Sequence, residues 1–171
     1  MILRPASLDD APALAALGRD TFVARFGDMY SEADLSAFLT EVYAVDAVAE
    51  EIAGPHCIHR LAEDESGLLA FCKLRHPSWY AEHSDAADPI ALGQLYTRPD
   101  RIGEGIGAAL MDWAIAEARD RGCDAIQLSV WSGNDDAQRF YARYGFTKIA
   151  DIGFPVGEQV DEEFLFELRL D

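Results

Sequence analysis

The sequence contains few cysteines, few basic residues and no long apolar run, and each scarcity excludes a class of protein. Its three cysteines, Cys57, Cys72 and Cys123, are scattered without CxxC spacing, which excludes a disulfide framework and argues against zinc. The four histidines do not stand at ligand spacing either, so we expect no metal. No stretch approaches the roughly 18 apolar residues of a membrane span, and the first residues lack the features of a secretory signal. We therefore expect a cytoplasmic protein without a membrane partner.

Basic residues are outnumbered by acidic ones. The chain has 14 Lys and Arg and 31 Asp and Glu, which gives a formal net charge of −17. Such a chain repels phosphate backbones and anionic lipids, so nucleic acid is not an expected partner. The same charge attracts cationic small molecules, although acidity for solubility alone explains it equally well.

Linkers, repeats and low-complexity tracts are also absent, and 171 residues with 50% hydrophobic content suffice for one core. We predict a single domain over residues 1–171. Strand patterns occupy residues 1–5, 57–63, 68–75, 90–97, 125–131, 146–152 and 164–170. Helical patterns begin at about Leu8 and recur over residues 31–42, 46–54, 105–121 and 135–144.

The connections between these segments indicate the fold class. The turn sequence DESG between residues 57–63 and 68–75 predicts an antiparallel hairpin. The helix over 105–121 joins two strands in a crossover that makes neighbouring strands parallel. The acidic stretch GEQVDEE, residues 157–163, is predicted to connect the last two strands. An α+β, or mixed α/β, fold follows.

The stretch RIGEGIG, Arg101 to Gly107, places three glycines between a strand and a helix. Free amides at a helix N-terminus attract an anion, and glycine lets a pyrophosphate approach the backbone. A tight strand-to-helix connection is the alternative explanation. No GxxxxGK[ST] motif occurs. Gly103, Gly105 and Ala108 satisfy the dinucleotide fingerprint formally, but the next strand lacks the acidic residue that accompanies it.

Two segments together resemble a known family. QLYTRPDRIGEGIGAALMDWA is similar to the acyl-CoA pyrophosphate loop of the GCN5-related N-acetyltransferases (GNAT family), and GNDDAQRFYARYGF is similar to their FYxxxGF helix. The resemblance covers Ile90 to Phe146. It implies a central mixed, mostly antiparallel sheet of six to seven strands with flanking helices, and transfer of an acetyl group from acetyl-CoA to an amine.

The ends of the chain resemble one branch of this family. RDTFVARFGDMYSEADLSAFL and GFPVGEQVDEEFLFELRL are similar to the PaiA-type spermidine/spermine acetyltransferases. The resemblance therefore implies a small-molecule primary amine as acceptor, with a polyamine favoured. An amino acid, an antibiotic or a protein N-terminus is the alternative acceptor.

The resemblance also implies which residues hold the coenzyme. Backbone groups of Leu95, Tyr96 and Thr97 would pair with the pantetheine arm, and Asn134 would hydrogen-bond near it, unless Asn134 is only a helix N-cap. The pyrophosphate would be held by the loop. Its residues are Ile102, Gly103, Glu104, Gly105, Ile106, Gly107 and Ala108.

Two departures from the family pattern stand in this sequence. Ile102 occupies a position where Gln or Arg is usual, which weakens phosphate binding at most because the backbone does most of it. The segment Ala91 to Gln94 lacks the glutamate that serves many relatives as general base. An ammonium with a pKa near 10.4 must lose its proton before it attacks a thioester. The group that accepts this proton is unassigned.

The remaining site predictions concern a proton donor and an acceptor pocket. The resemblance points to Tyr141 as the donor to the leaving thiolate, while its place on the apolar stripe of its helix also suits a core aromatic. Asp28, Tyr30 and Glu82 are predicted for the amine pocket, with solvated loop charges as the alternative.

Two further functions stay open. One is a non-catalytic, regulatory acyl-CoA-binding module, because the family glutamate is missing. The other is a dinucleotide-binding domain. No feature of the sequence decides the oligomeric state, and a homodimer is compatible with it.

Overall fold

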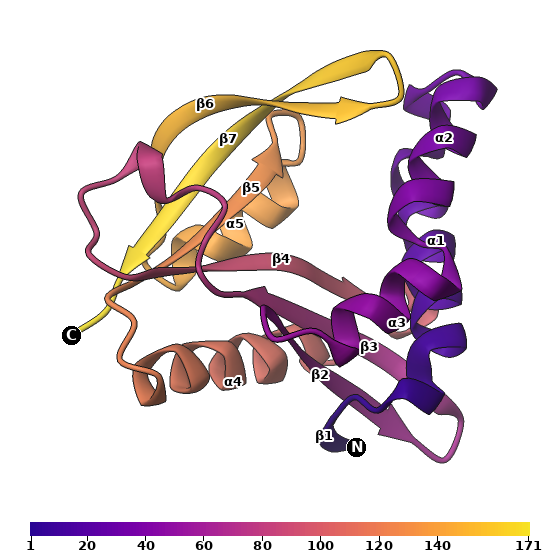
Figure 1. Cartoon of the computed structure of the whole chain (residues 1–171), viewed down its shortest axis with the longest axis horizontal. Coiled ribbons are helices and arrows are strands. Elements are labelled where there is room, and N and C mark those ends of the chain that lie inside the picture. Colours follow the sequence, from indigo (N-terminus) through magenta and orange to yellow (C-terminus); the bar gives the residue numbers. More distant parts are fainter.

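Seven strands form one mixed sheet in the order β1-β2-β3-β4-β5-β7-β6 (Figure 1). The computed structural model describes residues 1–171. All neighbouring strands are antiparallel except β4 and β5, which are parallel. The strands are β1 (Ile2–Pro5), β2 (Cys57–Asp64), β3 (Gly67–Arg75), β4 (Pro89–Thr97), β5 (Ala125–Trp131), β6 (Thr147–Val156) and β7 (Gln159–Arg169). The predicted α+β class with a mostly antiparallel sheet is confirmed.

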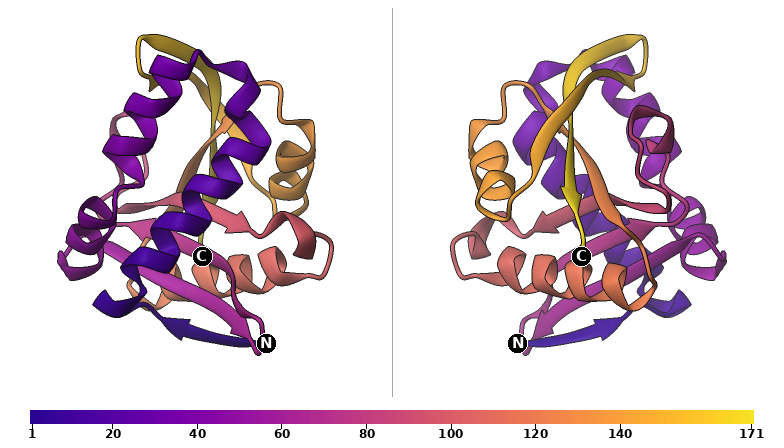
Figure 2. Two further views of the ribbon diagram at one scale, coloured as in Figure 1. Left: turned by 90° about the vertical axis from the view of Figure 1, so that its right-hand side faces the viewer. Right: turned by 90° about the vertical axis from the view of Figure 1, so that its left-hand side faces the viewer.

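Five α-helices cover the two faces of the sheet (Figure 2). They are α1 (Ala11–Phe26), α2 (Glu32–Val42), α3 (Val45–Ala53), α4 (Ile106–Asp120) and α5 (Asp135–Arg143). Side chains of α1 and α3 pack with Leu61 and Phe71 of the sheet on one face, and α4 and α5 pack on the other. None of the helices combines the length and the apolar character needed to cross a bilayer.

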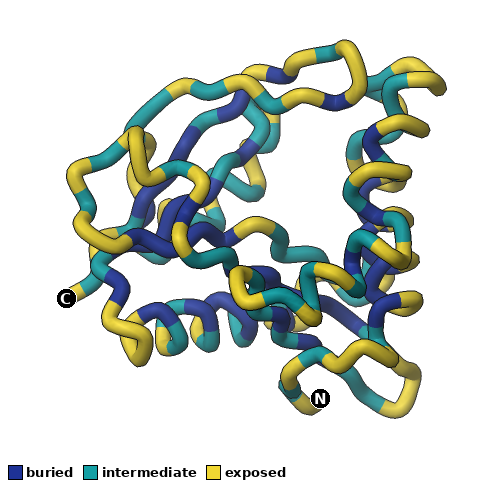
Figure 3. The backbone as a smooth tube through the Cα atoms, viewed as in Figure 1, coloured by how far each residue is buried: buried dark blue, intermediate teal, exposed yellow.

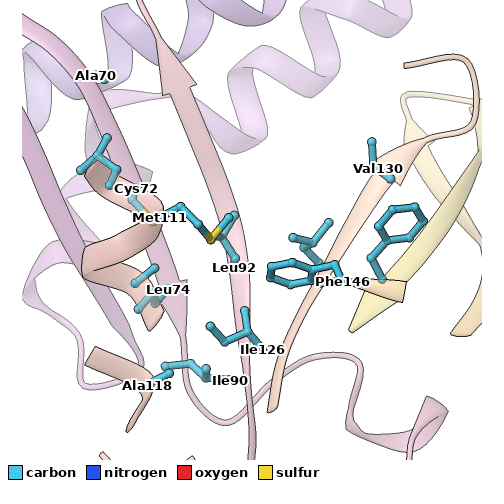
Figure 4. Packing of buried hydrophobic residues seen from close by; sticks show 14 of the residues in the cluster. Ala70, Cys72, Leu74, Ile90, Leu92, Met111, Ala118, Ile126, Val130 and Phe146 are labelled. Atoms are coloured by element: carbon cyan, nitrogen blue, oxygen red, sulfur yellow. The ribbon is translucent and has the colours of Figure 1, made fainter. Parts of the chain in front are cut away.

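The larger hydrophobic cluster lies between α4 and the sheet. The buried residues of α4 are Ile106, Leu110, Met111, Ala114 and Ala118, which form one stripe at the helical period. In Figure 4, Met111 reaches toward Leu92 of β4. Burial of each large apolar side chain contributes roughly 1.5–3 kcal/mol. Figure 3 shows the buried residues concentrated along the strands and the inner helix faces, so the core fixes the sheet against α4.

The last strand begins earlier than its sequence predicts. GEQVDEE contributes only a two-residue turn, and Gln159 to Glu163 already belong to β7. The backbone N–H of Glu158 at this turn donates to Asp34 Oδ1 of α2 at 2.9 Å, which ties the β6–β7 hairpin to the helices. Acidic residues are depleted in strands, so local composition conceals a segment that strand pairing stabilises.

Candidate active site

The parallel strands β4 and β5 pair over only three residues and then separate. The register joins Pro89–Ala91 to Ala125–Gln127 and extends no further. Because the other edge of β4 is paired with β3, alternate residues after Ala91 direct their N–H and C=O groups into the gap. The gap lies within a cavity of about 590 Å³. An extended ligand can therefore bind there in the manner of an additional strand.

The glycine loop follows β4 and ends at a helix N-terminus with unpaired amides. Gly103 and Gly105 have φ angles of +89° and +80°, a left-handed conformation that residues with a Cβ disfavour. A Cβ at either position would meet no atom within 4 Å, so the ligand-free protein needs these glycines for their backbone conformation. The N–H of Ala109 donates to the carbonyl of Gly105 at 3.1 Å, and the preceding amides of α4 lack helical partners. These amides and the helix dipole favour an anion.

Arg101 anchors this loop to the β2–β3 hairpin. Its guanidinium lies 3.0 Å from Asp64 Oδ2 and 2.8 Å from Glu104 Oε2. The charge of Arg101 is therefore already paired, and the backbone amides are the main groups that the loop offers to a phosphate.

Asn134 is the N-cap of α5, and its role toward the coenzyme stays a prediction. Its Oδ1 caps α5 by accepting from the backbone N–H of Ala137 at 3.3 Å, and it also accepts from Arg25 Nη2 at 2.7 Å. Asn134 borders the cavity. Since Oδ1 serves both contacts, the side-chain NH₂ is left to donate to a ligand.

Tyr141 is half-buried on α5 and borders the same cavity. Its ring packs against Phe140 and Phe146, with ring centroids 5.4 and 5.8 Å away. Burial raises the pKa of its phenol well above the usual value, so Tyr141 is protonated at neutral pH. The ring contributes to packing while the hydroxyl is chemically able to donate a proton.

Three carboxylates border the cavity, and two of them come from β7. Asp161 and Glu163 are two residues apart, so both point to the same face of the strand. Only 9% and 7% of their surfaces are exposed. Asp161 accepts hydrogen bonds from the Tyr30 hydroxyl and, at 2.8 Å, from Gln159 Nε2. The third carboxylate, Asp136, is exposed and paired with Arg139.

Glu163 accepts a hydrogen bond from one hydroxyl group and makes none of the ion pairs of the chain. Its Oε1 accepts from Ser129 Oγ at 3.3 Å, and the Tyr80 hydroxyl donates to Ser129 Oγ at 3.2 Å. Burial raises the pKa of Glu163 to about 7, the hydrogen bond from Ser129 opposes this change, and the charge of Asp161 adds to it. The carboxyl can therefore take up and release a proton near neutral pH.

Comparison with known proteins decides which family this architecture represents. A family model described as the acetyltransferase (GNAT) family matches residues 22–146. The chain belongs to the GNAT acetyltransferase family. The match includes the glycine loop and α5, the segments that carry the resemblance in sequence. The protein is therefore an N-acetyltransferase that uses acetyl-CoA.

Relatives and solved structures agree with this membership. The chain is 27% identical over 161 residues to an N-acetyltransferase from the pepI 3′ region of Lactobacillus delbrueckii subsp. lactis, covering 94% of this chain and 92% of the relative. It is 28% identical over 144 residues to the aminoalkylphosphonate N-acetyltransferase of Salmonella typhimurium, covering 84% and 83% of the two chains. The fold is similar to that of PaiA N-acetyltransferase from Thermoplasma acidophilum in complex with coenzyme A, with a TM-score of 0.79, 22% identity, and 99% and 98% coverage.

The GNAT fold brings the predicted coenzyme residues to one end of β4. Those that border the cavity are Leu95, Tyr96, Thr97, Ile102, Gly107 and Asn134. Gly103, Glu104, Gly105, Ile106 and Ala108 complete the adjoining loop and first helical turn. Their individual roles stay predictions.

Of the residues predicted for the amine pocket, the structure brings only Tyr30 to the cavity. Asp28 is exposed on the turn Gly27–Met29, and Glu82 on the turn Ala81–His83 has a side chain that is 82% exposed. Neither borders the cavity. A position beside a helix end or in a long loop does not define the direction of a side chain, so the sequence pattern of these two residues did not indicate their exposure.

Sequence reasoning missed Asp161 and Glu163 because the acidic composition of their segment is typical of a connection and not of a strand. A usable signal was present, since both alternate with Leu165 and so belong to one strand face.

Outside the cavity, the structure also gathers side-chain atoms of metal-ligating type, from His76, Asp88 and Cys123, within 4.8 Å of one another. His76 Nε2 and Asp88 Oδ1 are themselves 2.7 Å apart.

Proposed function

We propose that this GNAT protein acetylates a primary amine of a small cationic molecule, with a polyamine as the favoured acceptor. The observation that carries the proposal is the pair of buried carboxylates, Asp161 and Glu163, in the cavity wall without an ion-pair partner. A buried negative charge is costly unless a positive group compensates it, and an ammonium entering the cavity would do so. The net charge of −17 adds attraction at longer range.

The coenzyme would lie along the gap between β4 and β5. Acetyl-CoA supplies the acetyl thioester when it is bound. The loop amides suit its pyrophosphate, and the backbone of Leu95, Tyr96 and Thr97 suits its pantetheine arm. We assign the NH₂ of Asn134 to the same arm, because Arg25 and the N-cap contact occupy its oxygen. Backbone binding of this kind positions the ligand with little dependence on side-chain identity.

The chemistry requires stabilisation of charge on the thioester oxygen and protonation of the leaving sulfur. The amide N–H of Leu95 is our candidate for the first role, because a fixed backbone dipole in a partly enclosed site stabilises developing negative charge. Tyr141 is our candidate for the second role, since its phenol is protonated at neutral pH and borders the cavity.

An amine panel tests the acceptor class. Thiol release is measured with spermidine, a free amino acid, an aminoglycoside, a peptide N-terminus and an aminoalkylphosphonate, each against a reaction without amine. We expect the highest kcat/KM for spermidine. Preference for the anionic aminoalkylphosphonate would refute the electrostatic argument. Coenzyme binding without turnover of any amine would instead favour the non-catalytic module.

Asp161→Asn tests the electrostatic argument within the chain. Loss of this buried charge is expected to raise the KM for spermidine about tenfold, while a neutral amine is affected less. Glu158→Gln, on the exposed hairpin turn, is the matched control and should leave both values unchanged. Equal KM changes for charged and neutral amines would mean that Asp161 acts through the structure of the pocket alone.

A further inference from the structure

The proposed amine acceptor needs a proton acceptor that the family resemblance does not provide. Near neutral pH an alkylamine is almost fully protonated, and a protonated nitrogen has no lone pair with which to attack the thioester. The segment Ala91–Gln94 has no acidic residue. The carboxylates that border the cavity are Asp136, Asp161 and Glu163.

Two of these carboxylates are engaged elsewhere. Asp136 is paired with Arg139 and its side chain is 79% exposed, so its charge is already compensated. Asp161 accepts hydrogen bonds from both Tyr30 and Gln159, so each of its two oxygens already has a donor. Glu163 accepts one long hydrogen bond, from Ser129 at 3.3 Å. Its remaining acceptor positions are available.

We propose that Glu163 is the catalytic base that takes the proton from the acceptor ammonium, an assignment that rests on the proposed amine acceptor. It borders the cavity, and only 7% of its surface is exposed. Ser129 and Tyr80 hold its carboxylate in a fixed position through consecutive hydrogen bonds. A buried, oriented carboxylate without a cationic partner is suited to proton transfer.

The titratable groups around Glu163 are the carboxylate of Asp161 and the phenols of Tyr30, Tyr80, Tyr96 and Tyr141. The phenols do not compete for this proton. Burial raises the pKa of each phenol, and the negative charge of Glu163 adds to the effect, so all four stay protonated at neutral pH. Arg25 borders the same cavity but donates to Asn134.

The proton balance closes with these groups. The ammonium gives one proton to Glu163, which becomes a neutral acid. The amine nitrogen then forms a bond with the acetyl carbon while the carbon–sulfur bond breaks. The nitrogen loses a second proton, the sulfur gains one from Tyr141, and the phenolate of Tyr141 recovers that second proton. Glu163 releases its proton to solvent before the next turnover, so one proton is produced per amide formed.

The test is the pH dependence of kcat/KM for the best amine between pH 5.5 and 9. In the wild type we expect an acidic limb with an apparent pKa near 7, the pKa that burial gives Glu163. Glu163→Gln should lower kcat/KM about 100-fold at pH 7.5 and abolish this limb. Glu162→Gln, the exposed neighbour on the opposite face of β7, should behave as the wild type.

Two further variants should move the limb in opposite directions. Ser129→Ala removes a hydrogen bond that favours the ionised form of Glu163, so the apparent pKa should rise. Asp161→Asn removes a neighbouring negative charge, so it should fall. A merely structural role for Glu163 predicts no such opposite displacement. Calorimetry with CoA shows whether each variant keeps the folded coenzyme site.

The outcomes separate the two proposals. If Glu163→Gln binds CoA and keeps kcat/KM within threefold of the wild type with the limb unchanged, Glu163 is not the base, although the proposed function stands. If the wild type turns over no amine in the panel, the proposed function fails and the assignment of Glu163 fails with it.

Discussion

The buried carboxyl of Glu163 should make the stability of this protein depend on pH in a direction opposite to that of most acidic groups. In the unfolded chain this carboxyl has its ordinary pKa of 4.5, and in the folded protein burial raises the pKa to about 7. Below pH 4.5 both states hold the proton. As the pH rises toward 7, the unfolded state loses its proton first, so the free energy of unfolding falls. Above pH 7 both states are ionised and the loss is complete.

The magnitude follows from the two pKa values. Each tenfold change in proton affinity corresponds to about 1.4 kcal/mol, so a pKa moved from 4.5 to about 7 costs about 3 kcal/mol once the carboxyl is ionised. Only 7% of the residue is exposed, so solvent screens little of this cost. About 2 kcal/mol of it falls between pH 5.5 and 8.5.

Glu163→Gln removes the ionisation and keeps the size of the side chain. The difference in unfolding free energy between variant and wild type, from urea denaturation, should change by about 2 kcal/mol in favour of the variant from pH 5.5 to 8.5. Taking the difference cancels the titration of the other groups. For Glu162→Gln the same difference should be independent of pH. A pH-independent difference for Glu163→Gln would show that its pKa is ordinary and would refute the reasoning.

Three other substitutions test the remaining parts of the site. Tyr141→Phe should lower kcat about 100-fold with CoA affinity retained, and unchanged turnover at every pH would remove Tyr141 from the mechanism. Arg25→Ala deletes the 2.7 Å hydrogen bond to Asn134 and should weaken CoA binding about fivefold by calorimetry; unaltered affinity would mean that Asn134 needs no such support. Gly105→Ala, at φ +80°, should lower the unfolding free energy by about 1–2 kcal/mol, whereas a stability equal to the wild type would contradict the conformational requirement.

Much of the architecture could be predicted because the signals are local. The strand over residues 125–131 matches β5 in both bounds, since its alternating apolar side chains mark a strand wherever they occur. The helix after the glycine loop was predicted within a residue of α4, because Gly105 and Gly122 stand at its ends. The GNAT resemblance rests on segments of the same local kind.

The acceptor end of the cavity could not be predicted in this way. The Tyr30 and Asp161 side chains that meet there are separated by 131 positions in the chain. Asp28 and Glu82 stand in comparable sequence contexts, and the structure leaves both on the surface. The meeting of Tyr30 and Asp161 depends on how the β6–β7 hairpin packs against α1 and α2.

Local spacing in the chain was therefore enough to define the strands, the helices and the backbone loop for the coenzyme, because their geometry depends on residues within a few positions of one another. Folding alone decided where Asp161 and Glu163 lie and how readily Glu163 holds a proton. That property arises from burial and from partners on distant segments, and neither exists until the strands have paired.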